Sequence, residues 1–251
     1  VTWSPAPPST FTTAGTFTFT GSVYGVSSEP SICADTGSVT CPFTVDVVKV
    51  NSLTASSPAT LIKTEGEIDY YVAACNEGGT VTITATPYVD VSDSDLRFIG
   101  WSLTGGSGSG LRTRTLSLSQ PGEYPLKAQC GTSEKNIVVM VLKVESINVD
   151  ASNPEATNVK YKVTGGTLPS ATITAPGIEA TRSNIPEGFF SFTYNQNNLE
   201  DGINKIILKT IIGNFEVTVE ISATKTEKSG PYATEIASDK VFLEEGAATV
   251  P

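Results

Sequence analysis

The chain has 251 residues, of which 39% are hydrophobic and 17% are charged, a balance typical of a globular protein rather than a disordered one. Its net charge of −10 opposes binding to nucleic acid or to an anionic membrane surface, because like charges repel. The chain contains no histidine, which excludes Ser-His-Asp and Cys-His catalysis within it. No apolar run approaches the ~20 residues that a membrane-spanning helix needs.

The first fifty residues resemble a later part of the same chain. The matching blocks are "WSPAPP" with "WSLTGG", "AGTFTFTGSV" (14–23) with "PGEYPLKAQC" (121–130), and "PFTVDVVKVNSLTASSP" (42–58) with "NIVVMVLKVESINVDASNP" (136–154). A period near about one hundred residues suits a β-sandwich module rather than a solenoid repeat. We therefore expect residues 1–50 to be the C-terminal part of a module, with Trp3 and Trp101 as equivalent core residues. The chain has no starting Met, and we expect it to have been processed or excised at both ends.

Residues 51–145 are predicted to form a complete module. The segment "TVTITATPYV" (80–89) alternates apolar and polar residues, which predicts a strand that buries Val81, Ile83 and Ala85 on one face. The run "GGSGSG" (105–110) is predicted to be a flexible connection. The other expected strands of this module are "LTASSPATLI" (53–62), "LRFIGWSL" (96–103), "LRTRTLSLS" (111–119), "GEYPLKAQC" (122–130) and "NIVVMVLKV" (136–144).

Residues 146–226 are predicted to form a second complete module, and residues 227–251 a tail. The module has neither Trp nor Cys. Its expected strands are 158–166, 171–177, 189–194, 204–213 and 214–223. The tail contains "KVFL", a glycine turn and "ATV", which is similar to "EGGTVTI" (77–83). The tail thus resembles the first strands of a further module.

Short strands, regular turns and the lack of helical periodicity predict an all-β chain of antiparallel β-sandwiches. The string "GGTVTITATP … GWSL … PGEYPLKAQCG … IVVMVLKV" resembles bacterial immunoglobulin-like modules of the PKD and Big kind, which occur in secreted and surface proteins. Trp101, the corner 121–124 and Cys130 carry the resemblance. It implies tandem immunoglobulin-like sandwiches, an extracellular or cell-surface location, and a corner tyrosine, Tyr124, whose hydroxyl ties a loop to the backbone. The segment "TEGEIDYYVAAC" (64–75) departs from the pattern as an insertion.

Four cysteines are present, Cys33, Cys41, Cys75 and Cys130. An even number in an acidic, histidine-free β protein predicts two disulfides, and the alternative is four free thiols. On the map of a module that the resemblance supplies, Cys33 and Cys41 share one turn and are expected to pair. Cys75 and Cys130 are left for each other, although those positions could lie at opposite ends of a regular sandwich. That second pairing is left open.

Two groups of residues are candidate binding sites. Asp90, Asp93 and Asp95 form an acidic loop that could bind Ca²⁺, which prefers six to eight oxygen ligands, and a solvated turn is the alternative. Tyr70 and Tyr71 could stack on a carbohydrate, and packing in the core is the alternative. No other cofactor is expected, and no pair of acids suggests glycoside hydrolysis.

These patterns predict a non-catalytic extracellular structural protein: a surface fibre, an adhesin stalk or a filament subunit. Its partners would be other copies of itself or neighbouring modules of a longer chain. The missing strands of the first module could come from the same chain, from another copy by strand exchange, or from a segment of a longer array. The alternative function is a carbohydrate-binding accessory region of a larger secreted enzyme, with a glycan as its partner.

Overall fold

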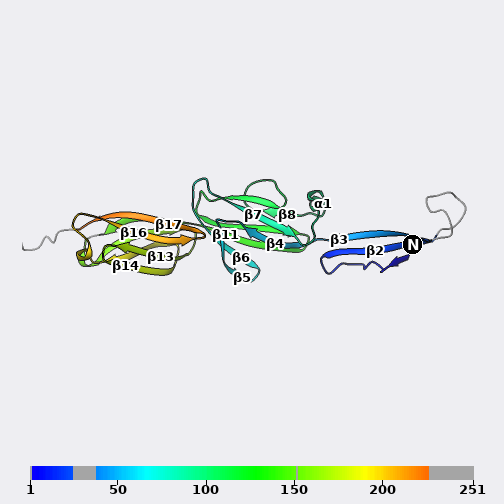
Figure 1. The fold of residues 1–251 in the computed structure, drawn as a ribbon, viewed down its shortest axis with the longest axis horizontal. Coiled ribbons are helices and arrows are strands. Elements are labelled where there is room, and N and C mark those ends of the chain that lie inside the picture. Colours follow the sequence, from blue (N-terminus) through cyan, green and yellow to red (C-terminus); the bar gives the residue numbers. More distant parts are fainter. Residues whose placement is uncertain (1, 25–37, 151, 226–251) are drawn as a thin grey trace, which may run out of the picture. The chain divides into compact units, whose positions relative to one another are not determined.

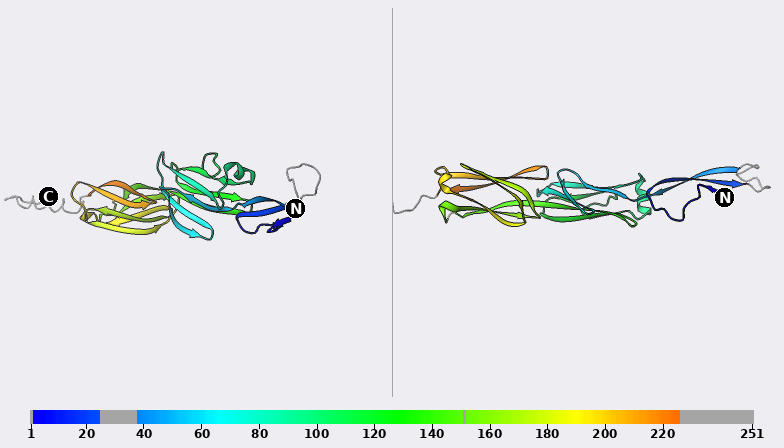
Figure 2. Two further views of the ribbon diagram at one scale, coloured as in Figure 1. Left: turned by 45° about the vertical axis from the view of Figure 1, so that its right-hand side comes forward. Right: turned by 90° about the horizontal axis from the view of Figure 1, so that it is seen from below.

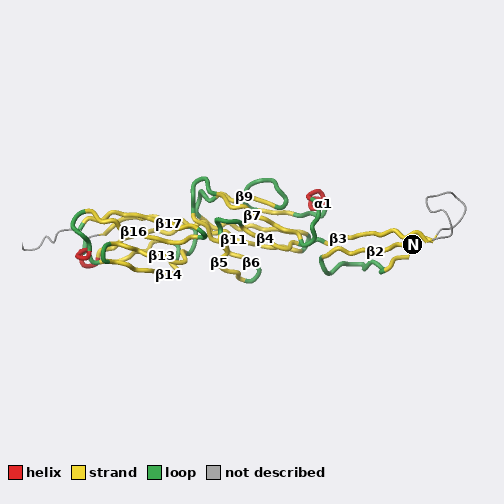
Figure 3. The backbone as a smooth tube through the Cα atoms, in the orientation of Figure 1, coloured by secondary structure: helices red, strands yellow, loops and turns green. Residues whose placement is uncertain are grey.

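The computed structural model describes residues 2–24, 38–150 and 152–225, and strands dominate them (Figure 1; Figure 3). The chain divides into two compact units. The first runs to Leu142 and includes Ile212–Phe215, and the second contains Lys143–Ile211 and the residues from Glu216 onward. The predicted all-β class is confirmed, and the complete modules are immunoglobulin-like antiparallel sandwiches. Among the described residues, none of the helices has the length and hydropathy that crossing a bilayer requires.

The first unit begins with a three-stranded antiparallel sheet that we call the amino-terminal sheet. It consists of β1 (Thr2–Ser4), β2 (Gly15–Tyr24) and β3 (Ser38–Val47), in the order β1–β2–β3. Aromatic and β-branched residues alternate with threonines along β2 and β3, which favours a pleated strand with one apolar face. Among the described residues, no second sheet covers this one.

A two-layer sandwich, which we call the middle module, follows β3 directly. One layer contains β4 (Val50–Ala55), β7 (Thr80–Pro87) and β9 (Thr113–Ser117). The other layer contains β5 (Thr60–Glu65), β6 (Ile68–Ala74), β8 (Ser102–Thr104), β10 (Gly122–Cys130) and the first part of β11 (Ser133–Asp150). Both layers pair antiparallel except at one place, where β6 runs parallel to β11. The segment 64–75 therefore supplies a regular strand rather than an insertion.

The core of the middle module lies between these two layers. Val81, Ile83 and Ala85 on β7 are at most 1% exposed, which confirms the predicted alternation. Trp101 is also buried, and its indole N–H donates to the Leu111 carbonyl over 2.7 Å. The predicted corner bond is present as well, because the Tyr124 hydroxyl donates to the Gln120 carbonyl over 2.9 Å.

Two predictions for the loops of the middle module are wrong. The first three residues of the expected strand 96–103 belong to helix α1 (Asp93–Phe98), because Ser92 and Asp95 form a reciprocal capping box that favours a helix start. Only Ser102 and Leu103 of that stretch lie in a strand, β8. The segment 105–110 is not a free linker. The Ser107 N–H donates to the Thr115 carbonyl over 2.7 Å and the Thr115 N–H donates back over 3.0 Å, so this loop is bonded to β9.

The second unit is another sandwich, and its two layers are seen edge-on in the right-hand view of Figure 2. One layer contains the last part of β11, β12 (Thr157–Thr164) and β15 (Gly188–Tyr194), and the other contains β13 (Leu168–Ala175), β14 (Ile178–Ile185), β16 (Ile203–Ile212) and β17 (Phe215–Thr224). Two 3-10 turns cover Pro154–Ala156 and Gln196–Asn198. No strand was expected at β14, because this strand exposes most of its side chains and lacks an alternating pattern.

Candidate interaction surface

The two faces of the amino-terminal sheet differ sharply in polarity. Residues directly opposite each other on antiparallel strands share a face, and here Phe19 pairs with Phe43 and Phe17 with Val45. We call this side the apolar face; it consists of Trp3, Phe17, Phe19, Phe43, Val45 and Val47. The other face is formed by Thr16, Thr18, Thr20, Thr44 and Asp46.

Aromatic rings pack across the apolar face. The ring of Phe11, from the loop between β1 and β2, lies 5.0 Å from that of Phe17 and 6.2 Å from that of Phe19. The ring of Trp3 lies over Gly21 and 6.0 Å from the ring of Phe43. Trp3 nevertheless remains 41% exposed and Phe43 52% exposed. The apolar face is therefore only partly covered by its own loop.

The amino-terminal sheet has the same strand pairing as β8–β10–β11 of the middle module. Gly15 pairs with Val47 and has a φ of +154°, while Gly122 pairs with Val141 and has a φ of +155°. A Cβ on Gly15 would lie 3.8 Å from the ring of Phe17, and a Cβ on Gly122 would lie 3.8 Å from the ring of Tyr124. In both places the ring belongs to the residue two positions after the glycine. The sequence repeat is thus also a structural repeat.

The register of the repeat corrects the predicted equivalence of the tryptophans. Trp3 pairs with Gly21, and the corresponding pair in the middle module is Leu103 with Ala128. Trp3 therefore matches Leu103, whereas Trp101 precedes β8. Trp3 is not a core residue, because no covering layer lies over it among the described residues.

In the middle module the matching face is fully covered. Leu103, Leu126 and Ile137, which match Trp3, Phe19 and Phe43, are at most 2% exposed. The layer β4–β7–β9 packs on them through side chains such as Leu53 and Ile83. The outer edge of β11 is also occupied, by β6. The amino-terminal sheet lacks both features among the described residues, so it offers an apolar face and an unpaired edge on β3.

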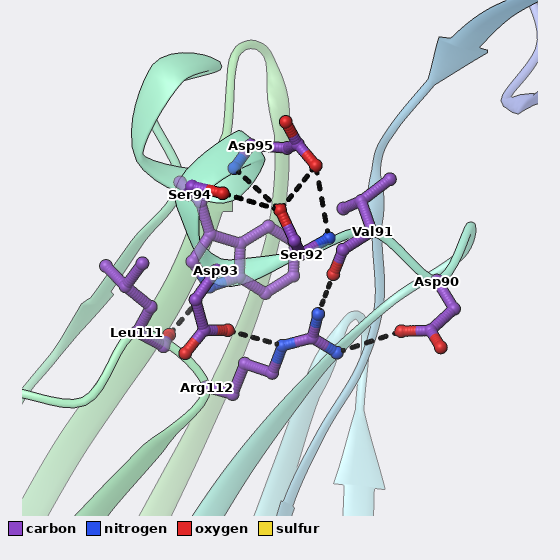
Figure 4. Close-up of polar contacts among 9 residues, drawn as sticks. Asp90, Val91, Ser92, Asp93, Ser94, Asp95, Leu111 and Arg112 are labelled. Atoms are coloured by element: carbon purple, nitrogen blue, oxygen red, sulfur yellow. Dashed lines mark hydrogen bonds and ion pairs between the residues drawn. The ribbon is translucent and has the colours of Figure 1, made fainter.

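The predicted acidic site has a different arrangement (Figure 4). The Arg112 guanidinium donates to Asp93 Oδ1 over 3.0 Å and to Asp90 Oδ1 over 3.2 Å, and also donates to the Val91 carbonyl. Asp95 points away from Arg112 and accepts from the Ser92 N–H as part of the helix cap. One arginine thus binds the loop that was expected to bind a cation.

This geometry does not support a calcium site. Among the residues that the structure describes, no group of three or more acidic or cysteine side chains is placed to hold a metal ion. The Arg112 charge also opposes a cation beside Asp90 and Asp93, by Coulomb repulsion. Calcium binding by Asp90, Asp93 and Asp95 stays an untested prediction.

Tyr70 and Tyr71 do not form a shared platform. They are consecutive residues of β6, so their side chains leave opposite faces of the sheet. Tyr71 packs in the core of the middle module, where burial raises the pKa of its hydroxyl. Tyr70 is half-buried, and the ammonium of Lys63 lies 4.6 Å from its ring centre. Tyr70 and Tyr71 thus share no stacking surface, and carbohydrate binding by them stays an untested prediction.

Cys75 and Cys130 lie at opposite ends of one layer, so the pairing between them that the sequence left open does not form. The Cys75 N–H donates to the Leu142 carbonyl, whereas Cys130 pairs with Ser133. Leu142 and Ser133 are nine residues apart on β11, which corresponds to about 30 Å. A disulfide needs Cα atoms within about 7 Å of each other. Cys33 and the side chain of Cys41 lie outside the described part of the chain, and their pair stays a prediction.

No protein-family model and no curated protein matches this sequence. Several solved structures are similar in fold. The fibronectin(III)-like modules of CbhA from Clostridium thermocellum are 12% identical, with a TM-score of 0.24, and the match covers 71% of this chain and 97% of that one. Domains 4 and 5 of the S-layer protein SbsC are 16% identical, with a TM-score of 0.22, and the match covers 70% of this chain and 99% of that one. Domains 3 and 4 of rat CD4 are 13% identical, with a TM-score of 0.25, and the match covers 57% of this chain and 77% of that one. The modules of this chain are immunoglobulin-like β-sandwiches. That statement rests on the strand order and pairing described above.

Proposed function

We propose that this chain is a non-catalytic structural segment of an extracellular or cell-surface protein, in which the amino-terminal sheet is one half of a module. The observation that carries the proposal is the repeat. β1–β2–β3 reproduces the pairing of β8–β10–β11, yet the face that is buried in the middle module stays open in the amino-terminal sheet. Assembly by strand exchange between copies would supply the missing half.

The physical reason for assembly is the combination of two unsatisfied surfaces. Trp3 and Phe43 form an exposed aromatic pair, and burying apolar area of this kind stabilises an interface by roughly 25 cal/mol per Å². The outer edge of β3 also carries backbone N–H and C=O groups without a strand partner among the described residues. An exposed apolar strand edge readily accepts another strand.

A structural role also agrees with how the described polar residues are used. Asp90 and Asp93 are bound to Arg112, and Asp95 caps a helix, so these acids stabilise loops. The alternative of a carbohydrate-binding region has less support, because the tyrosines that it requires lie on opposite faces of β6.

The assembly proposal is tested by sedimentation of the full chain over a range of concentrations. We expect assemblies of more than one copy, and their average size should increase with protein concentration. Phe43→Asp places a carboxylate on the apolar face and should weaken association at least tenfold, about 1.4 kcal/mol. Thr44→Asp is the matched control, because the adjacent side chain lies on the polar face and is also exposed. A chain that stays monomeric at every concentration would remove the assembly role.

A further inference from the structure

The middle module shows which strands cover a face like that of the amino-terminal sheet. Its β6 runs parallel to β11. The first pair is Ile68 with Asn136, and the last is Ala74 with Leu142. The chain then turns through Gly78, which has a φ of +77°, and enters β7. Val81 and Ile83 of β7 are fully buried in the core. The β6–β7 segment therefore supplies both the strand that pairs with β11 and the central strand of the covering layer.

The carboxyl-terminal tail carries a sequence with the same pattern. Residues 240–250, "KVFLEEGAATV", match residues 72–81, "VAACNEGGTV", with one additional residue in the turn. Both contain a short apolar run, then Glu-Gly, then Thr-Val. On this match Val241 and Leu243 take the places of Ala73 and Cys75, which contact the core, and Val250 takes the place of Val81.

The acceptor edge is defined by the repeat. Residues 240–242 match Val72–Ala74, which pair with Met140–Leu142 of β11. Asp46–Val48, at the end of β3, match Met140–Leu142 and are therefore the expected acceptor residues. Among the residues that the structure describes, no strand pairs with this edge of β3.

We propose that residues 240–250 of a second copy dock on the amino-terminal sheet, with residues 240–243 parallel to the outer edge of β3 and residues 249–250 over the apolar face. This inference rests on the proposed assembly and names its donor, acceptor edge and strand direction. Two complete modules separate the tail from the amino-terminal sheet in the sequence, which favours a second copy over the same chain. Such a head-to-tail contact links each copy to the next, and it produces filaments where the rotation between copies does not close a ring.

The test mixes two full-length variants, each with one defective end. Val241→Asp disables the donor, and its matched control Lys240→Asp places the same carboxylate on the opposite face of the docked strand. Phe43→Asp disables the acceptor, with Thr44→Asp as its control. Alone, each defective variant should stay monomeric. Mixed, they should form a dimer of one copy of each, because one intact tail meets one intact face, and the two controls should assemble like the original chain.

Hydrogen exchange gives a second measurement on the same mixture. The backbone N–H groups of Asp46–Val48 that point away from β2 should exchange at least tenfold more slowly in the mixed dimer than in either variant alone, because the docked strand pairs with them. Assembly that persists in Val241→Asp would overturn the donor assignment while leaving the proposed assembly in place. Monomers whose β3 amides are protected, and lose that protection in Val241→Asp, would show completion within one chain and overturn the second-copy inference.

Discussion

Two tyrosines in the core of the second unit carry hydroxyls without a hydrogen-bond partner among the described residues. Tyr161 on β12 is fully buried and stacks on Phe190 with ring centres 5.5 Å apart, and Tyr194 ends β15. Burial, together with the nearby Tyr194, raises the pKa of Tyr161 from 10.0 to about 12. Each hydroxyl lowers the stability that a purely apolar ring would provide, because a buried polar group without a partner loses its bonds to water.

The raised pKa of Tyr161 predicts a stability loss at alkaline pH. The folded state holds the proton of the Tyr161 hydroxyl more tightly than the unfolded state. The resulting contribution to the free energy of unfolding is fully present below pH 10 and is lost as the pH rises through about 12. At about pH 11 the loss should be about 1 kcal/mol. Urea unfolding from pH 8 to 11 measures it. Tyr161→Phe should lose less stability over this range and should be at least as stable as the original chain at neutral pH.

An equal alkaline loss in the original chain and in Tyr161→Phe would contradict the assignment to Tyr161.

At the scale of elements, the loop before β9 is held by close backbone packing. Gly106 has a φ of +65°, and a Cβ there would lie 2.8 Å from the Thr115 carbonyl oxygen on β9. Gly108, two residues on, also has a positive φ, of +101°, but a Cβ there would meet no atom within 4 Å. The run of glycines thus has a steric role at one position and mainly a conformational role at the other.

This difference gives a matched pair of substitutions. Gly106→Ala should destabilise the middle module by about 1–3 kcal/mol more than Gly108→Ala, because only the first pushes β9 away from its bonds to Ser107. Thermal or urea unfolding of both variants measures the difference. Equal losses would mean that the loop moves away from β9 at little cost.

At the scale of the whole molecule, the separation of Cys75 and Cys130 predicts how its thiols react. Burial raises the pKa of the Cys130 thiol, which therefore reacts slowly in the folded chain. After denaturation and alkylation without reductant, no peptide pair joined by a Cys75–Cys130 disulfide should be found, because about 30 Å separates the two residues along β11. Mass spectrometry of the alkylated peptides measures this. A Cys75–Cys130 disulfide within one copy would contradict the strand order of the middle module.

The contrast between the amino-terminal sheet and the middle module is the main feature at this scale. The same pairing of three strands occurs twice, and only one copy has its covering layer within the described residues. If a second molecule completes the amino-terminal sheet, the chain acts as a subunit of an assembly. The paired variants at Phe43 and Val241 test this.

The sequence by itself determined the features that depend on local periodicity and on the repeat. The alternation of apolar and polar residues predicted that Val81 and Ile83 lie in the core, and the repeat matched Gly15 with Gly122. The resemblance to immunoglobulin-like modules predicted the hydrogen bond of the Tyr124 hydroxyl. Only the tertiary structure decided features that depend on which distant strand lies opposite. The tertiary structure placed Tyr71 in the core and left Trp3 partly exposed. It also paired Asp90 with Arg112, and put Cys75 and Cys130 at opposite ends of a layer. Strand periodicity is set by neighbours two residues apart, whereas register and coverage are set by pairing between strands far apart in the chain.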